Sequence, residues 1–187
     1  MKEFFNIKYT DVIDLVLKQN IVGLFQGKSE GGPRALGNRT LMFDPRNVDA
    51  KKIVNKVKKR EWYRPFAGTI LLEYAKEWFY MEGLDESPFM MYAMKVKENK
   101  IDLIPGIIHV DKTCRIQTVT QEQNYHYYNL IKCFYEKTGV PILFNTSFNL
   151  GGKTLVYTEN DAIGTLQQSM IEYIYLPEKE KIIFIEN

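Results

Sequence analysis

A helix, a buried strand and a polar loop follow one another in residues 123–152, QNYHYYNLIKCFYEKTGVPILFNTSFNLGG. The apolar side chains of residues 123–137 recur at helical spacing, and Gly139 follows as a helix-ending glycine. Residues 140–144 then form a short apolar run that is typical of a buried strand, and the polar residues 145–149 come directly after it. This order predicts helices packed on a β-sheet, with polar groups lying beyond a strand end.

Helical and strand patterns continue on both sides of this segment. Further helices are predicted for residues 10–20, with Thr10 or Asp11 as the N-cap, for residues 47–59, with Asn47 or Asp49 as the N-cap, and for residues 159–170. Strands are predicted for residues 21–25, 66–72, 114–119, 171–176 and 182–185, and a hairpin for residues 89–96 and 101–104. We therefore expect an α/β protein of the α+β type, a twisted, open, mixed sheet with helices packed on it. Residues 1–187 are expected to form a single domain.

The composition excludes several classes of protein. Of the 187 residues, 45% are hydrophobic, and the formal net charge of +2 provides no broad basic surface for nucleic acid. The two cysteines, Cys114 and Cys133, do not form a CxxC pair, and nothing near Met1 resembles a signal peptide. No run approaches the roughly 18 consecutive apolar residues of a membrane span. We expect a cytoplasmic protein in which any anion-binding site is local.

Arginine is confined to one part of the chain. Of the 25 basic residues only six are arginines: Arg34, Arg39, Arg46, Arg60, Arg64 and Arg115. Five of these six fall between positions 34 and 64. A planar guanidinium grips a phosphate or carboxylate with two parallel hydrogen bonds, which a lysine cannot do. The distribution indicates an oxyanion site, and structural ion pairing is the alternative.

The first glycine-rich segment is not a Walker-type phosphate-binding loop. Gly27-Lys28-Ser29 invites that comparison, but the motif needs a glycine five residues before its Gly-Lys-Ser/Thr triplet, and Val22 stands there. Glu30 would also place a negative charge beside the phosphates. The glycines of residues 26–38 still predict an irregular, shaped loop.

A set of short motifs resembles a known family. The motifs are QGKSEGGPRALGNR (26–39), FDPR (43–46), WYRPFA (62–67), HVD (109–111), RIQTV (115–119) and FNTSFN (144–149). Their order and spacing resemble the C-terminal domain of O-carbamoyltransferases of the nodulation and antibiotic-tailoring type, from about Val22 to the end of the chain. That domain is similar to the YrdC/Sua5 fold, which is marked by a basic pair and a Ser-x-Asn motif. Ser147-Phe148-Asn149 matches the second mark, and Lys58 or Lys59 with Arg60 and Arg64 matches the first.

The resemblance implies an activity. The chain would bind carbamoyl phosphate and ATP, the latter with Mg²⁺, and form carbamoyl-adenylate. Carbamate released from carbamoyl phosphate would attack the α-phosphorus of ATP and displace pyrophosphate. In this family a larger Kae1-like domain with an iron-type metal site then transfers the carbamoyl group to a hydroxyl. No motif in these 187 residues matches that domain, so we expect it in a partner domain or subunit.

The expected site combines cations with uncharged hydrogen-bonding groups. Several fixed cations are needed because the two ligands bring about six negative charges into one cleft. We assign catalytic roles to Arg34, Arg64, Arg115 and His109, and ligand-binding roles to Lys58, Arg60, Ser147, Asn149 and Asn145. Arg115 has an alternative as the ion-pair partner of Asp111 or Glu122, and His109 as a hydrogen-bonded histidine of the fold. No metal site is predicted, because no side chains show metal-ligand spacing.

Ser147 and Asp44 are expected to position other groups, and neither is expected to act as a nucleophile or a base. Ser147 lacks a triad, since His109 and His126 are the only histidines, and we expect it to hydrogen-bond ATP without forming a covalent adduct. Asp44 lies in a turn with Arg46, where we expect it to orient the guanidinium.

Two other function classes compete with the enzyme. One is a non-catalytic nucleotide- or RNA-binding YrdC-like module, which the low net charge disfavours for RNA. The other is an interaction domain that uses the fold only to dock a partner. Such a domain would bind ATP without any dependence on carbamoyl phosphate.

Overall fold

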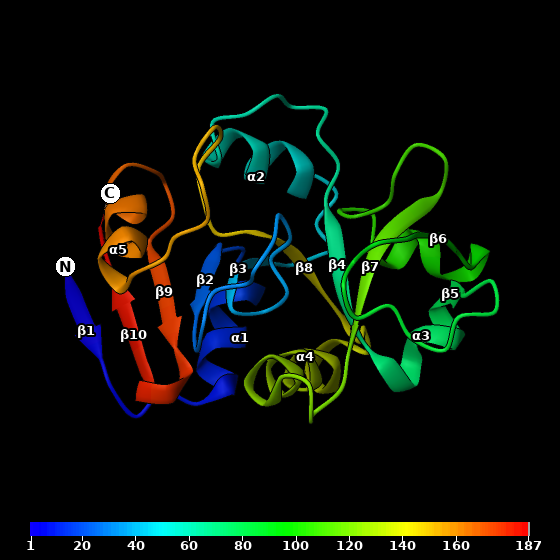
Figure 1. Ribbon diagram of the computed structural model, residues 1–187, viewed down its shortest axis with the longest axis horizontal. Coiled ribbons are helices and arrows are strands. Elements are labelled where there is room, and N and C mark those ends of the chain that lie inside the picture. The colour runs from blue at the N-terminus through cyan, green and yellow to red at the C-terminus, as the bar shows by residue number, and fades with distance from the viewer. Residues whose placement is uncertain (187) are drawn as a thin grey trace.

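Ten strands form one mixed sheet in the computed structural model, which describes residues 1–186 (Figure 1). Their order across the sheet is β1-β10-β9-β2-β3-β8-β4-β7-β6-β5. The strands are β1 (Lys2–Phe4), β2 (Val22–Phe25), β3 (Arg39–Phe43), β4 (Ala67–Leu71), β5 (Phe79–Tyr80), β6 (Ala93–Val96), β7 (Thr113–Val119), β8 (Ile142–Ser147), β9 (Tyr173–Leu176) and β10 (Lys181–Phe184). β2 and β9 run parallel, as do β4 and β7, and the other pairs are antiparallel. The predicted fold class, an open mixed sheet with helices, is confirmed.

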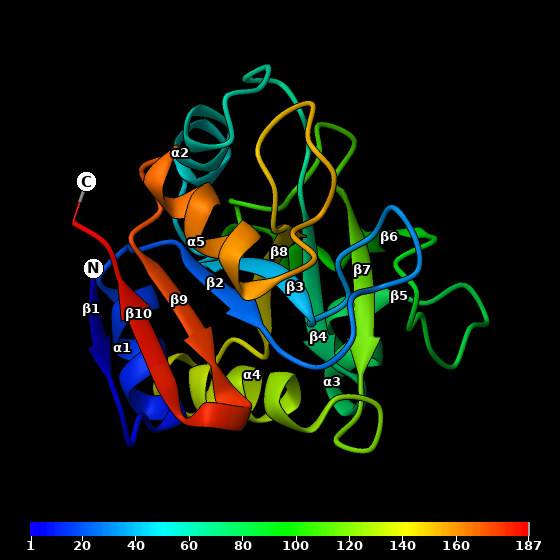
Figure 2. The ribbon, with the colours of Figure 1, turned by 60° about the vertical axis from the view of Figure 1, so that its left-hand side comes forward.

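The helices lie in two groups around this sheet. They are α1 (Tyr9–Leu17), α2 (Ala50–Val57), α3 (Leu72–Trp78), α4 (Tyr125–Thr138) and α5 (Glu159–Gln167), with 3-10 turns η1 (Glu98–Leu103) and η2 (Pro177–Lys179). Figure 1 shows α1, α4 and α3 along the lower side and α2 and α5 toward the upper side, and the turned view of Figure 2 keeps this separation. No helix within residues 1–186 is long and apolar enough to cross a membrane.

Local capping explains where the helices begin and end. The Asn124 side chain accepts a hydrogen bond from the backbone N–H of Tyr127 at 3.1 Å, and Gly139, with φ of +74°, ends α4 as expected. The predicted cap of the first helix is wrong, because α1 follows Lys8. Asp11 acts from inside the first turn, where its carboxylate accepts a hydrogen bond from the Lys8 N–H at 2.8 Å.

The predicted hairpin of residues 89–96 and 101–104 is also wrong. β6 begins only at Ala93 and pairs with β5 and β7, while residues 98–103 form η1. Ile101 and Ile104 are three residues apart, the period of a 3-10 turn, and Ile104 is fully buried. The elements β1, β3, β5 and α3 were not predicted, since each is short or begins with polar residues.

Gly37 is required by its backbone conformation and by its neighbours. Its φ is +104°, and a Cβ atom would lie 2.3 Å from Cδ1 of the buried Tyr127 ring. We predict that Gly37→Ala lowers the free energy of unfolding by about 2 kcal/mol or more, because left-handed strain and overpacking each cost about 1–3 kcal/mol. Urea unfolding followed by circular dichroism measures the change.

Gly164→Ala is the matched control for this prediction. Gly164 lies within α5, and the nearest outside atom would be 3.9 Å from an added Cβ, so alanine fits there. This variant should gain about 0.5–1 kcal/mol of stability. Equal stability of the Gly37→Ala variant and the parent would contradict the assignment.

Candidate functional site

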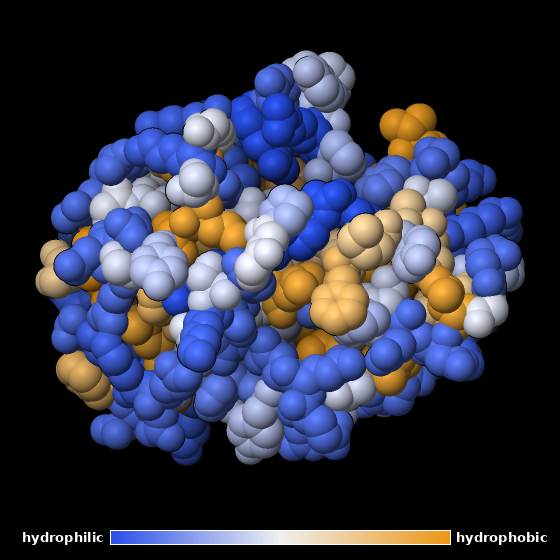
Figure 3. All heavy atoms as spheres, in the orientation of Figure 1, coloured by the Kyte–Doolittle hydropathy of each residue, from blue (hydrophilic) through white to orange (hydrophobic). Residues whose placement is uncertain are grey.

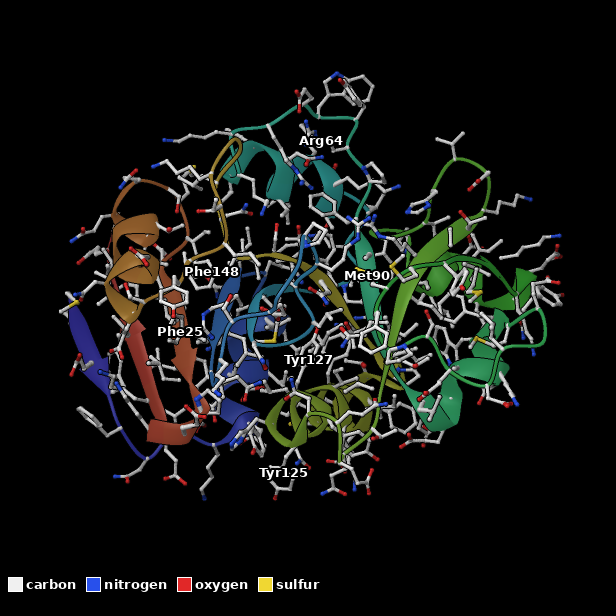
Figure 4. All side chains as sticks on the ribbon, viewed as in Figure 1. Phe25, Arg64, Met90, Tyr125, Tyr127 and Phe148 are labelled. Atoms are coloured by element: carbon white, nitrogen blue, oxygen red, sulfur yellow. The ribbon has the colours of Figure 1, made fainter. Side chains whose placement is uncertain are left out.

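A cavity of ≈330 Å³ opens where the C-terminal end of β8 meets the N-terminal ends of β4 and β7. The loop 33–35, the link from α2 to β4 and the residues after β8 form its walls. The lining residues are Pro33, Arg34, Ala35, Lys58, Arg60, Arg64, Pro65, Phe66, Ala67, Met90, Arg115, Asn145, Thr146, Ser147, Asn149, Leu150, Gly151, Gly152 and Lys153. In Figure 4 Arg64 lies above Met90, and in Figure 3 hydrophilic side chains gather over the link that follows α2. Eight of the nine residues predicted for the site therefore surround one cavity.

The sheet register places two of these residues in one row. Asn145 on β8 pairs with Ala67 on β4, which pairs in turn with Arg115 on β7. Directly paired residues project their side chains from the same face of a sheet, and strands lie about 4.8 Å apart. Asn145 and Arg115 thus flank the small side chain of Ala67 at a backbone separation of about 10 Å. Ala67 leaves space for a ligand between them.

The loop 26–38 is held in shape by Glu30 and Arg39, which were not among the predicted site residues. One carboxylate oxygen of Glu30 accepts hydrogen bonds from the backbone N–H groups of Leu36, Asn38 and Arg39, at 2.7, 2.8 and 3.2 Å. The buried Arg39 guanidinium donates to the carbonyls of Gln26 and Gly27 at 2.5 and 3.1 Å. Arg39 therefore braces the loop that carries Arg34, and it does not line the cavity.

Asn55 fixes the link that carries Arg60 and Arg64. Its buried amide donates to the carbonyls of Trp62 and Arg64 at 2.9 and 3.0 Å, and its oxygen accepts from Arg60 Nε at 2.6 Å. Arg60 also lies over the Phe66 ring, 4.4 Å from its centroid. Asn55 was not among the predicted site residues, although an amide beside the inward-facing Val54 indicates a buried polar group.

Lys58 joins the basic motif to the Ser-x-Asn motif. Its ammonium donates to the Ser147 carbonyl and, at 2.9 Å each, to the carbonyl and the side-chain oxygen of Asn149. Lys59 points elsewhere and donates to the carbonyl of Gln168, so Lys58 is the lysine of the motif. Burial lowers the pKa of Lys58 to about 7, and the nearby charge of Arg60 acts in the same direction.

The Ser-x-Asn segment closes around this lysine. The Ser147 hydroxyl donates to the Asn149 side-chain oxygen at 2.7 Å, and the Gly151 N–H donates to the Lys58 carbonyl at 2.7 Å. A Cβ atom on Gly151 would lie 2.8 Å from the Lys59 carbonyl oxygen, so glycine permits this close approach. The partner of the Ser147 hydroxyl is an amide oxygen, which is not a general base.

The cavity is strongly cationic. Six lining residues are basic, namely Arg34, Lys58, Arg60, Arg64, Arg115 and Lys153, and none of the lining residues is Asp or Glu. Burial, followed by the charge of Arg64, lowers the pKa of Arg60 to about 10, and burial, followed by the charge of Arg34, lowers the pKa of Arg115. Glu61 pairs with Arg64 Nε at 2.7 Å on the exposed side of the link.

Two guanidinium groups still have hydrogen-bonding capacity. Arg60 Nη2 and Arg115 Nε are buried and have no hydrogen-bond partner among residues 1–186. Arg115 forms no ion pair with Asp111 or Glu122 among the ion pairs of these residues, so that alternative is wrong. Unpaired cationic donors in a cavity without carboxylates are suited to a ligand with several anionic oxygens.

His109 lies outside the cavity, which corrects its predicted place in the site. Its Nε2 contacts the Phe66 carbonyl at 3.0 Å, and its Nδ1 contacts the Thr113 hydroxyl at 3.1 Å. Nε2 thus connects the loop before β7 to the residue that precedes β4, and Nδ1 contacts the first residue of β7. The sequence does not reveal these contacts, because a histidine between two loops has the same local pattern whether its ring nitrogens are free or hydrogen-bonded.

Within residues 1–186 no group of three or more His, Cys, Asp or Glu side chains could hold a metal ion.

The predicted pairing of Asp44 with Arg46 is confirmed, since Arg46 Nη2 donates to the buried carboxylate at 2.7 Å. This pair lies outside the cavity lining.

Known proteins with similar sequences include a nodulation protein and an O-carbamoyltransferase. Over 147 residues the chain is 46% identical to the nodulation protein NolO of Bradyrhizobium diazoefficiens, covering 78% of this chain and 27% of that protein. It is 34% identical over 143 residues to the 3'-hydroxymethylcephem-O-carbamoyltransferase of Amycolatopsis lactamdurans, covering 76% of this chain and 27% of that protein. The chain spans between about a fifth and a third of the length of its curated relatives.

The fold resembles part of a solved structure, and a family model matches most of the chain. The fold is similar to that of full-length HypF in a phosphate- and nucleotide-bound form, with a TM-score of 0.64 at 17% identity, covering 96% of this chain and 21% of HypF. The family model described as Carbamoyltransferase C-terminus matches residues 13–180. The chain belongs to the carbamoyltransferase C-terminus family, as its motifs predicted.

Proposed function

We propose that the cationic cavity binds carbamoyl phosphate and ATP and that the chain catalyses the formation of carbamoyl-adenylate. The observation that carries this proposal is the convergence of six basic side chains on a cavity without a lining carboxylate, with unpaired donors on Arg60 and Arg115. The names of the O-carbamoyltransferase relatives support the carbamoyl group, and the phosphate- and nucleotide-bound form of HypF supports a phosphate-bearing ligand.

The proposed reaction has two steps. Water first hydrolyses carbamoyl phosphate to carbamate and orthophosphate. A carbamate oxygen then forms a bond to the α-phosphorus of ATP, the bond from this phosphorus to the oxygen that bridges the α- and β-phosphorus atoms breaks, and pyrophosphate leaves with that oxygen. Both steps concentrate negative charge on non-bridging oxygens, so fixed cations stabilise their transition states.

Each side chain has a defined part in this scheme. Arg34, Arg60, Arg64 and Arg115 hold phosphate oxygens, and Lys58 combines charge with the positioning of Ser147 and Asn149. Ser147 and Asn149 remain uncharged at neutral pH and bind by hydrogen bonding, without a covalent step. Mg²⁺ enters with ATP as part of that substrate. Transfer of the carbamoyl group to a hydroxyl belongs to a separate Kae1-like domain or subunit.

The test is pyrophosphate exchange. The purified chain should incorporate labelled pyrophosphate into ATP only when carbamoyl phosphate is present, because the reverse reaction needs carbamoyl-adenylate. It should also convert ATP slowly to AMP, since a mixed anhydride in an open cavity is lost to water. ATP binding without any carbamoyl-phosphate dependence would instead indicate a non-catalytic nucleotide-binding module.

The lowered pKa of Lys58 predicts a pH-dependent affinity for anions. Because this pKa is about 7 in the ligand-free protein, Lys58 is cationic below that pH and neutral above it. Sulfate, whose charge is constant in this range, should bind about tenfold more weakly at pH 8.5 than at pH 6, as one charged hydrogen-bonding group is lost. Isothermal titration calorimetry measures the profile. Lys58→Met should flatten it, and an unchanged slope in that variant would assign the effect to another group.

A further inference from the structure

The carboxamide of Asn145 lies at the wall of the cationic cavity and is almost completely buried, with 1% exposure. Its Nδ2 lies 3.0 Å from the Ala35 carbonyl oxygen, 2.9 Å from Thr69 Oγ1 and 3.3 Å from Gln117 Oε1. These three contacts connect β8 with the loop 33–35, with its sheet neighbour β4 and with β7, the strand beyond β4.

The contacts determine which way the amide points. Rotating it by 180° would turn its oxygen toward the Ala35 carbonyl and toward Gln117 Oε1, which are both acceptors. Gln117 cannot turn to compensate, because its own Nε2 donates to the Leu36 carbonyl at 3.0 Å. The side-chain oxygen of Asn145 is therefore directed away from this network.

That oxygen has no hydrogen-bond partner within residues 1–186. A buried amide oxygen that loses its partner costs about 1–3 kcal/mol, so the site favours a ligand that supplies an N–H or O–H group. The other unpaired groups of the cavity are the guanidinium nitrogens Arg60 Nη2 and Arg115 Nε, which are donors. A small molecule that carries both anionic oxygens and a hydrogen-bond donor would be complementary to these three groups.

We propose that Asn145 is the residue that selects the carbamoyl group, accepting a hydrogen bond from its NH₂ while the arginines hold the phosphate oxygens. This inference rests on the proposed function and adds the origin of its specificity. Acetyl phosphate carries a methyl group in place of the NH₂ and would leave the Asn145 oxygen unpaired. Orthophosphate carries the same anionic oxygens but no acyl group.

The experiment compares the affinities of the purified chain for carbamoyl phosphate, acetyl phosphate and orthophosphate by calorimetry. The parent should prefer carbamoyl phosphate to acetyl phosphate by about 10- to 100-fold. Asn145→Leu should bring this ratio close to one while orthophosphate binding persists. Asn129→Leu on α4, outside the cavity lining, is the control and should keep the parental ratio.

A second variant separates orientation from folding. Thr69→Val removes only the hydroxyl next to Asn145 Nδ2, loosening the amide without deleting it, and should lower the ratio to an intermediate value. A parental ratio in both the Asn145→Leu and Thr69→Val variants would overturn the role of Asn145. If the parent binds neither orthophosphate nor carbamoyl phosphate, the proposed function itself is overturned. If the parent binds both but does not prefer carbamoyl phosphate to acetyl phosphate, only the selection by Asn145 is overturned.

Discussion

Replacing Lys58 by methionine should lower the rate of carbamoyl-phosphate-dependent pyrophosphate exchange by about 10²–10³-fold, the usual cost of deleting a preorganised transition-state donor. The substitution removes a buried charge and all the contacts of the ammonium with Ser147 and Asn149. Methionine fills a similar volume without a desolvation cost, which offsets part of the cost of leaving the Ser147 and Asn149 carbonyls unpaired, so the variant should still unfold cooperatively. Exchange of labelled pyrophosphate and urea unfolding measure the two quantities.

Lys59→Met is the matched control for this variant. Lys59 is the next residue in the chain, but it is exposed, and its ammonium donates to the Gln168 carbonyl outside the cavity. Its replacement should leave the exchange rate near that of the parent. Equal rates for the two lysine variants would remove Lys58 from the catalytic site.

Replacing Arg115 by alanine should weaken the binding of ATP and of carbamoyl phosphate by about 10- to 100-fold each, because hydrogen bonds to charged groups contribute about 1.5–3 kcal/mol. The ligand-free protein should not lose stability. Its Arg115 guanidinium is held among like charges with an unpaired Nε, so alanine relieves both the burial and the repulsion from Arg34. Calorimetric titration should therefore show weaker binding of both ligands. Urea unfolding should show a free energy of unfolding equal to or higher than that of the parent.

Lysine at position 115 distinguishes charge from geometry. A single ammonium cannot reproduce a two-pronged grip on phosphate, so Arg115→Lys should recover only part of the affinity. Arg46→Lys is the control, since Arg46 pairs with Asp44 away from the cavity and lysine can keep that ion pair. Full affinity for both ligands in the Arg115→Ala variant would contradict a shared phosphate-binding site.

The sequence alone predicted those parts of the molecule that depend on neighbouring residues. Helical spacing with the helix-ending Gly139 located α4, and the apolar run after it located β8, although that strand extends to Ser147 and so contains Asn145. Motif order predicted the family, and the confinement of arginine predicted a local cationic site. These signals are local because backbone propensity and side-chain periodicity depend on residues that are close together in the sequence.

Only the tertiary structure decided which polar groups meet. Lys58 reaches Ser147 and Asn149 across 89 and 91 residues, and the sheet order β3-β8-β4-β7 that permits this contact has no local signature. The tertiary structure also brings the Phe66 carbonyl to Nε2 of His109 and leaves the oxygen of Asn145 without a partner. Whether two polar groups form a hydrogen bond depends on the distance and direction between residues that are far apart in the sequence. Residue type determines only which donors and acceptors are available. The sequence therefore supplied the chemical groups of the site, while strand pairing determined which of them remain free to bind a ligand.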